Sequence, residues 1–161
     1  MEPVSDSLIT LIKTWFDYNA AHGILIRRLK TRSDAYDVIN PERESVFFQG
    51  KDYDYATLCF VVYHGRFPRP GCIVDHINRI RIDHRIENLR EATPTQNQQN
   101  KGGFGFYAKG VTWRDRKKKP WQAKIRVNGT RLHLGSFATE EEAAEAYRQA
   151  AFKYHKEFAC V

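Results

Sequence analysis

The stretch from Cys72 to Asn100 constrains the fold most strongly. It opens with a short apolar run, after which polar residues stand at fixed spacings. The pair Asp75-His76 ends the apolar run, Asn88 comes twelve residues after the histidine, and Asn97 nine residues later. The pattern predicts a strand ending at Asp75-His76, a loop, a return strand through Asn88 and a helix carrying Asn97.

The predicted helix has its own start signals just before Asn97. Thr93 suits the cap position, Pro94 the first helical position, and Gln96 completes a capping box. A hairpin followed at once by a capped helix is therefore the expected local fold.

The residue types in this stretch suit phosphodiester hydrolysis. Asp75 and Asn97 offer oxygen ligands, and Mg²⁺ takes few protein ligands while keeping several waters. His76 faces the other side of the strand, because successive side chains alternate, so we predict a general base there rather than a ligand. Asn88 is interpreted as structural, with its amide tying the loop to the backbone.

This spacing, within the phrase DHINR…IENLREAT…QNQQN, resembles the HNH nucleases, and more narrowly the phage-encoded homing endonucleases with asparagine in the third motif position. The resemblance implies a ββα-metal fold that hydrolyses DNA with one divalent ion, Mg²⁺ by default and Mn²⁺ as the second candidate. It implies Asp75 and Asn97 as metal ligands, and His76 and Asn88 as the general base and the loop-ordering residue of the catalytic set.

His84 departs from the pattern, since related sequences often have asparagine after the aspartate at this point. Three interpretations stay open: a surface substitution, a phosphate contact or an extra metal ligand. The surface substitution is the favoured one.

The remaining N-terminal residues predict supporting elements. They are a helix with a capping start at Ser5 and an end near Tyr18-Asn19, a strand at Ile24 to Ile26, a strand at Val46 to Phe48, and a buried helix from Asp54 to Gly65 that packs against the hairpin. The basic run from Arg27 to Arg32 is interpreted as a solvated loop, with DNA backbone contact as the alternative.

The C-terminal part predicts a three-stranded antiparallel sheet packed on one helix. The strands are expected at Gly110 to Arg114, Trp121 to Val127 and Arg131 to Phe137, with a type I′ turn at Asn128-Gly129. A helix capped by Thr139 follows. Its inward face is expected to carry Ala143, Tyr147, Ala150, Ala151 and Tyr154.

Alternation along these strands divides the side chains between two faces. The apolar ones, Trp113 and Leu134 among them, are predicted to point toward the helix. The opposite face and the loop tip collect polar and basic residues predicted to bind double-stranded DNA: Thr112, Arg114, Arg116, Lys117, Lys118, Lys119, Lys124, Arg126, Arg131 and His133.

The segment from Lys109 to Ala159, through KGV…W.AKIRV.G.R..LGSF.TEEEAAEAY..AA, resembles the Apetala/ethylene-response-factor DNA-binding domain of plants. The resemblance implies DNA contacts from the outer face of the sheet. The expected class is therefore α+β: residues 1–101 with a nuclease core at 53–101, a linker at 102–108, and the Apetala-like domain at 109–161.

Charge and cysteine usage agree with these expectations. The net charge of +7 favours a polyanionic partner, and three scattered cysteines without a CxxC predict neither a disulfide framework nor a zinc ribbon. Without a signal sequence or an apolar run of about 20 residues, we expect no membrane association and a cytoplasmic location, in a bacterial host if the gene belongs to a phage.

The leading hypothesis is a two-part DNA endonuclease, active as a monomer or homodimer. One alternative is a catalytically decayed HNH protein that acts as a DNA-binding or regulatory factor. Another, weaker one is a nuclease for RNA or branched substrates.

Overall fold

The computed structural model describes residues 6–29, 36–103 and 105–161. It divides into two compact units, residues 1–94 and 95–161. Both combine helices with small antiparallel sheets, which confirms the α+β class. The predicted cap at Ser5 and the end of the basic run, Lys30 to Arg32, lie outside the described residues.

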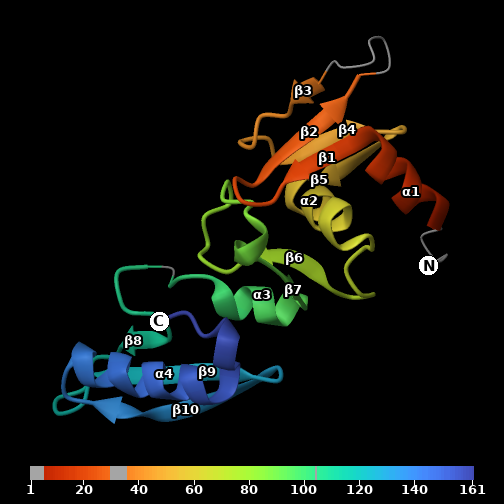
Figure 1. The fold of residues 1–161 in the computed structure, drawn as a ribbon. Helices are drawn as coiled ribbons and strands as arrows, with labels where there is room; N and C mark the ends of the chain where they lie inside the picture. The colour runs from red at the N-terminus through yellow and green to blue at the C-terminus, as the bar shows by residue number, and fades with distance from the viewer. Residues whose placement is uncertain (1–5, 30–35, 104) are drawn as a thin grey trace. The chain divides into compact units, whose positions relative to one another are not determined.

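In the described part of the first unit, residues 6–29 and 36–94, the chain forms ten elements (Figure 1). They are α1 (Asp6–Trp15), β1 (Phe16–Asn19), β2 (Ile24–Arg28), β3 (Tyr36–Val38), β4 (Ser45–Phe48), β5 (Lys51–Asp54), α2 (Tyr55–His64), β6 (Ile73–His76), the 3₁₀ turn η1 (Ile86–Asn88) and β7 (Leu89–Ala92). The strands pair antiparallel in the groups β1-β2-β3, β4-β5 and β6-β7.

The predicted first helix was too long. It ends at Trp15, and Phe16 opens strand β1, which pairs with β2 from Phe16↔Arg27 to Asn19↔Ile24. Phe16 is 1% exposed and packs edge-on against Phe48 with 5.1 Å between ring centroids. Its helical spacing was misleading, because strand pairing buries the same side chain without continuing the helix.

Helix α2 is buried and packs against the hairpin, as predicted. Asp54 caps its start by accepting a 2.8 Å hydrogen bond from the Thr57 N–H, and Gly65 ends it in the left-handed conformation with φ of 66°. Tyr55, Leu58 and Val61 are fully buried. The helix contacts α1, β1 and β6, so one buried segment holds the hairpin that carries Asp75 and His76.

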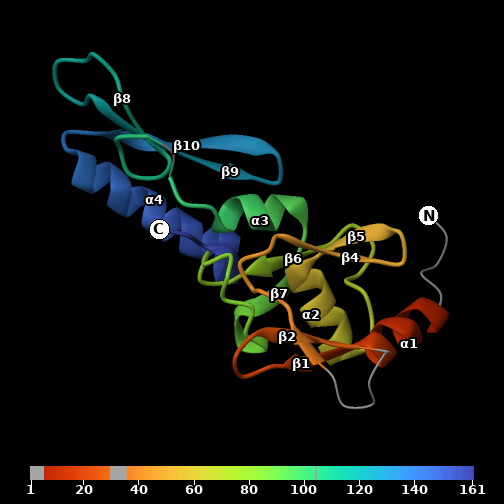
Figure 2. The same ribbon diagram turned by 90° about the horizontal axis from the view of Figure 1, so that it is seen from above.

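Most of the second unit is a sheet covered by a helix (Figure 2). Its elements are α3 (Pro94–Asn100, whose first residue falls on the unit boundary), β8 (Val111–Trp113), β9 (Trp121–Val127), β10 (Thr130–Phe137), α4 (Glu140–His155) and the 3₁₀ turn η2 (Lys156–Phe158). The strand order is β10-β9-β8, antiparallel throughout. Thr139 caps α4, accepting from the Glu142 N–H, as its sequence predicted.

Two side chains predicted to point into this unit lie outside. Trp113 is 48% exposed because β8 is a three-residue edge strand that ends with it, while Tyr107 packs edge-on against its strand partner Trp121. Tyr154 is 40% exposed. The inward place in the last turn of α4 belongs to His155, whose Nε2 lies 2.9 Å from the Arg126 carbonyl oxygen.

The predicted linker at 102–108 and the boundary between compact units after Pro94 are different divisions of the chain, and the extent of the functional domains stays a prediction. Within the described ranges, no helix combines the length and apolar character that crossing a bilayer requires.

Candidate active site

The β6–β7 hairpin positions the acid-histidine pair. Its register sets Asp75 opposite Arg90 and His76 opposite Leu89, and the Ile77 N–H closes the connecting loop with a 2.9 Å bond to the Asn88 carbonyl. Asp75 is buried, whereas His76 is half-buried at the edge of a pocket. The hairpin therefore separates the two side chains as the alternation predicted.

Asp75 is held by a partner that the motif did not reveal. Arg90 Nε donates to Asp75 Oδ2 at 3.0 Å, and the two side chains are only 14% and 6% exposed. A buried carboxylate needs such a countercharge. The strand register, which places the two residues opposite each other, is the signal that could have predicted this pair.

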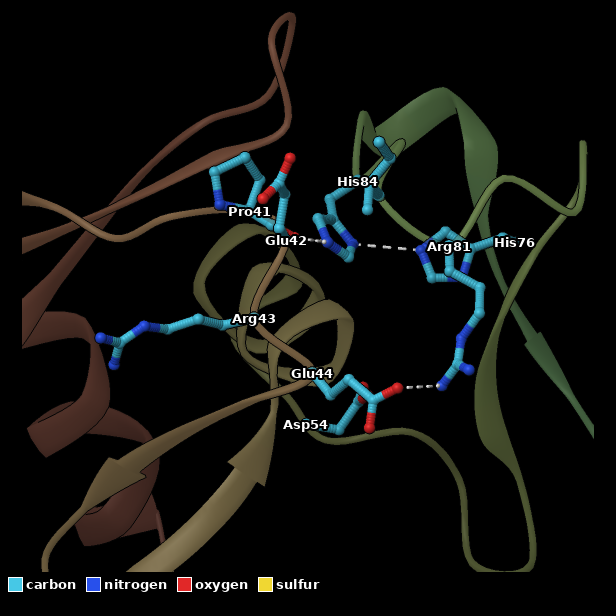
Figure 3. A pocket seen from close by; sticks show the side chains of 9 residues that line it. Pro41, Glu42, Arg43, Glu44, Asp54, His76, Arg81 and His84 are labelled. Atoms are coloured by element: carbon cyan, nitrogen blue, oxygen red, sulfur yellow. Dashed lines mark hydrogen bonds and ion pairs between the residues drawn. The ribbon is translucent and has the colours of Figure 1, made fainter.

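His76 belongs to a pocket formed within the first unit (Figure 3). Its Nε2 lies 3.1 Å from Nδ1 of His84, and burial, followed by the nearby His84, lowers the pKa of His76. Asp54, Asp75 and Asp83 oppose this shift. A lowered pKa keeps the imidazole neutral near pH 7, which is the state a general base requires.

The interpretation of His84 as a surface substitution was wrong. The side chain is 4% exposed, its ring stacks on Tyr55 with 4.4 Å between centroids, and its Nε2 lies 3.0 Å from the Pro41 carbonyl oxygen (Figure 3). Burial also lowers the pKa of His84. A position that looked like a variable loop residue is thus part of the packed interior.

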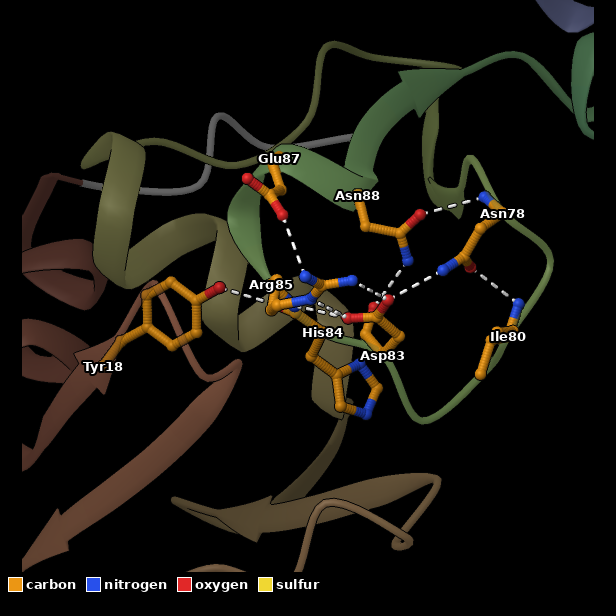
Figure 4. A network of polar contacts seen from close by, with 8 residues as sticks. All are labelled: Tyr18, Asn78, Ile80, Asp83, His84, Arg85, Glu87 and Asn88. Atoms are coloured by element: carbon orange, nitrogen blue, oxygen red, sulfur yellow. Dashed lines mark hydrogen bonds and ion pairs between the residues drawn. The ribbon is translucent and has the colours of Figure 1, made fainter.

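The loop between β6 and β7 is tied down by the Asn88 side chain (Figure 4). Asn88 Oδ1 accepts from the Asn78 N–H at 2.9 Å, and Nδ2 donates to the Asp83 carbonyl at 2.7 Å. Asp83 in turn accepts from Arg85 and from the Asn78 amide, and the Arg85 guanidinium holds the pKa of Asp83 well below its usual range. These are the contacts that a loop-ordering role for Asn88 requires.

The N-terminal hairpin fixes this loop from the opposite side, which sequence reasoning missed. Tyr18 Oη donates to the His84 carbonyl at 2.5 Å, and the Ile86 N–H donates to the Ala20 carbonyl at 3.3 Å. Gly23, with φ of 69°, lies so close that an added Cβ would stand 2.6 Å from backbone atoms of His84 and Arg85. No local motif in the sequence indicates such a long-range contact.

Asn97, the second expected metal ligand, lies on α3 in the second unit, whereas Asp75 lies in the first. Among the residues that the structure describes, no group of three or more His, Cys, Asp or Glu side chains could hold a metal ion. A single carboxylate with an amide fits Mg²⁺, which commonly binds through one or two carboxylates, waters and substrate phosphates. It does not fit zinc, whose structural sites use four Cys or His ligands.

The predicted DNA-binding residues lie on β8, β9, β10 and the loop between β8 and β9. All are exposed except Lys124, which is half-buried. The register sets Arg131 opposite Arg126 and His133 opposite Lys124. A hollow in the second unit is lined by five of the predicted residues, Thr112, Arg114, Lys124, Arg126 and Arg131, together with Lys101 and Lys109.

Comparison with known proteins bears on both units. Residues 58–99 match the family model of the HNH endonuclease. An uncharacterized HNH endonuclease of Acanthamoeba polyphaga mimivirus is 33% identical over 110 residues, which cover 68% of this chain and 57% of that protein. The HNH resemblance is confirmed.

The C-terminal part is similar to plant proteins. An AP2-like ethylene-responsive transcription factor of Arabidopsis thaliana is 58% identical over 54 residues, and one of Oryza sativa subsp. japonica is 54% identical over 54 residues. The match covers 32% of this chain but only 10% and 8% of those proteins. This confirms the second resemblance. The chain spans 57% of the viral HNH relative, and no solved structure matches it.

Proposed function

We propose that the protein is a metal-dependent HNH endonuclease of the homing type, which hydrolyses phosphodiester bonds of double-stranded DNA and is anchored by its C-terminal sheet. The observation that carries the proposal is His76, a half-buried imidazole held at a pocket edge by His84 beside the Asp75–Arg90 pair. The match of residues 58–99 to the HNH family supports the same reaction class.

In this mechanism His76 takes a proton from the attacking water. Burial favours its neutral form, so the imidazole can accept that proton near pH 7. Asn88 keeps the loop after β6 in one conformation through its bonds to Asn78 and Asp83, which fixes where His76 meets the substrate. Arg90 orients Asp75 from the neighbouring strand.

A divalent ion would be held by Asp75 and Asn97, with Mg²⁺ as the proposed ion and Mn²⁺ as a substitute. When bound, such an ion supplies polarisation of the phosphate and stabilisation of the leaving oxygen. A monomer with one such centre nicks one strand, whereas a homodimer cuts both.

The C-terminal sheet supplies affinity in this proposal. Its like charges stand directly opposite each other, as with Arg126 and Arg131, an arrangement that costs stability unless an anion neutralises it. The AP2-like similarity of this part favours DNA as that anion. Tethering raises the effective concentration of the nuclease unit on DNA, and phosphate contacts make binding depend strongly on salt.

The test is cleavage of supercoiled plasmid in Mg²⁺, with and without chelator, by the wild type and a His76→Ala variant. Loss of the general base should slow nicking by about 10²- to 10⁴-fold, and chelator should abolish it. His22→Ala removes an exposed histidine of the same unit and should cut at the wild-type rate. Full activity in His76→Ala would contradict the mechanism.

A second candidate is a DNA-binding protein without catalysis. It is favoured by one observation: the structure pairs the Asp75 carboxylate with Arg90 instead of gathering it into a group of metal ligands among the described residues. This candidate predicts retardation of DNA without cutting in either Mg²⁺ or Mn²⁺, and binding that Asp75→Ala leaves unchanged.

A further inference from the structure

Three polar groups form a line across the pocket: His76, His84 and the Pro41 carbonyl (Figure 3). His76 Nε2 lies 3.1 Å from His84 Nδ1, and His84 Nε2 lies 3.0 Å from the Pro41 oxygen. His76 and His84 belong to one hairpin, eight residues apart, whereas Pro41 comes from a distant part of the sequence. Only the last group, a carbonyl oxygen, has a fixed hydrogen-bonding role, since it always accepts.

That fixed role determines the protons of both rings. Because the Pro41 oxygen accepts, His84 Nε2 must carry a proton. In a neutral His84 the other nitrogen, Nδ1, then has the lone pair and accepts from His76. His76 Nε2 must therefore donate, which leaves Nδ1 as the basic nitrogen of the His76 ring.

His84 accepts from His76 only in its neutral form, and its surroundings favour that state. The ring is buried and stacks on Tyr55, while the pocket is lined by charges of both signs, Glu42, Glu44 and Asp54 with Arg43 and Arg81. Burial lowers the pKa of His84, although its bond to Pro41 and the charges of Asp54 and Asp83 act in the opposite direction.

We propose that His84 is a positioning residue that holds His76 in the Nε2–H tautomer, so that Nδ1 faces the water to be activated. This inference rests on the proposed nuclease function. It assigns to a buried residue of the chain the task of orienting the general base, in the way that a hydrogen-bonded second group orients a catalytic or metal-binding histidine elsewhere.

His84 is itself held rigidly enough for this task. Tyr55, whose ring supports it, is fixed by a 2.9 Å bond from the Leu25 N–H and a 3.1 Å bond to the Ile39 carbonyl. The His84 backbone is held by Tyr18. The residues before the HNH match at 58–99 thus support the base through His84, which gives the N-terminal elements a part in catalysis.

Two substitutions distinguish the role of His84 as a hydrogen-bond acceptor from its role in packing. His84→Asn places an amide oxygen where Nδ1 now lies, so it can still accept from His76, although it loses Pro41. His84→Leu fills a similar volume but accepts nothing. Long-range ¹⁵N–¹H spectra distinguish the tautomers directly, and with six histidines in the chain the His76 signals are assigned from His76→Ala.

In the wild type we expect His76 as the Nε2–H tautomer. His84→Asn should keep it, whereas His84→Leu should show exchange between tautomers. In plasmid nicking, His84→Leu should lower kcat about 10- to 100-fold with KM nearly unchanged, and His84→Asn should recover most of the loss. Circular dichroism and thermal melts establish that each variant is folded.

The proposal is overturned by an Nδ1–H tautomer of His76 in the wild type, or by equal losses in both variants. If His84→Leu does not fold, the wild-type tautomer and the kcat of His84→Asn still decide. The tautomer is measured by NMR without DNA or metal. If the wild type and all variants failed to cut, the nuclease function would be refuted, and the NMR measurement would still decide whether His84 positions His76. Normal cutting with the wrong tautomer would refute only the positioning.

Discussion

The surroundings of His76 and the outer face of the C-terminal sheet contrast in how their polar groups are held. Two side chains near His76, those of His84 and Asn88, are buried. Each makes hydrogen bonds to residues in other segments or across the loop. On the sheet face, Arg114, Arg126 and Arg131 are exposed to solvent.

The contrast corresponds to two kinds of chemistry. A general base must be held in one orientation toward the proton that it accepts, and buried hydrogen bonds fix its side chain there. Phosphate binding depends on the number of nearby charges and tolerates mobile side chains. Single substitutions should therefore be costly in the first region and mild in the second.

Asn88→Ala should have the largest effect on stability. It removes a buried side chain and leaves the Asn78 N–H and the Asp83 carbonyl without their bonds, which costs about 2–4 kcal/mol and disorders the loop beside His76. Urea unfolding and plasmid nicking would measure both. As control, Asn128→Gly changes an exposed turn residue with φ of 49° and should stay within about 0.5 kcal/mol. Equal costs at both sites would remove the contrast.

Gly23→Ala and Gly129→Ala compare the two regions at positions where the backbone φ angle is positive in both. Both glycines have positive φ, 69° and 81°, but only the first faces backbone atoms at 2.6 Å. Gly129→Ala adds only backbone strain, about 1 kcal/mol, whereas Gly23→Ala must also displace the chain at His84 and should cost about 2–3 kcal/mol. Calorimetric melting of both variants checks this. Similar values would mean that the N-terminal hairpin is not pressed against the loop.

The sequence predicted the elements that rest on local signals. The end of α2 at Gly65 and the Thr139 cap of α4 each involve residues within a few positions of each other, and the structure contains both. The strand pair β6–β7 was also predicted, but the return strand begins at Leu89, and Asn88, predicted within it, lies in the 3₁₀ turn η1. Such signals need no knowledge of the rest of the fold.

The misjudged residues depend on distant parts of the chain. Phe16 fits a helical pattern but is buried by pairing with β2, and His84 looks like a loop residue until Tyr55 and Pro41 are brought to it. Arg90 becomes a partner of Asp75 only through the strand register. The candidate base and ligands could thus be named from sequence, but not the groups that orient them.

Neutralising the lysines at the loop tip tests the expectation that substitutions in the sheet region have little effect on stability. Lys117, Lys118 and Lys119 changed together to Gln should leave the unfolding free energy within about 0.5 kcal/mol. The slope of log K against log salt should fall by up to about 0.9 for each lysine that contacts a phosphate. Changing the exposed Lys13, Lys51 and Lys153 instead alters the net charge equally and should change the slope less. Equal slopes in the two variants would exclude the tip as a DNA contact.

The last effect is the acid sensitivity contributed by Glu91 on β7. It accepts from Arg66 Nη1 and the Arg69 N–H, both at 2.7 Å, and the bond from Arg66 is the largest cause lowering the pKa of Glu91 to about 2. The folded-state pKa lies below the ordinary value of 4.5, so the unfolded chain binds more protons at acid pH. This stabilisation is present above about pH 4.5 and is lost as pH falls toward 2.

Glu91→Gln should therefore reduce stability at pH 6 and flatten the fall in unfolding free energy between pH 5 and 2.5, because the variant has no carboxylate to protonate there. Urea titrations at four or five pH values would show it. Glu42→Gln, which removes an exposed carboxylate from the same unit, serves as the control and should keep the wild-type slope. If the two variants gave the same pH profile, Glu91 would not hold the segment from Arg66 to Arg69 to the hairpin. The residues that fix the surroundings of His76 would then be those of the β6–β7 loop alone.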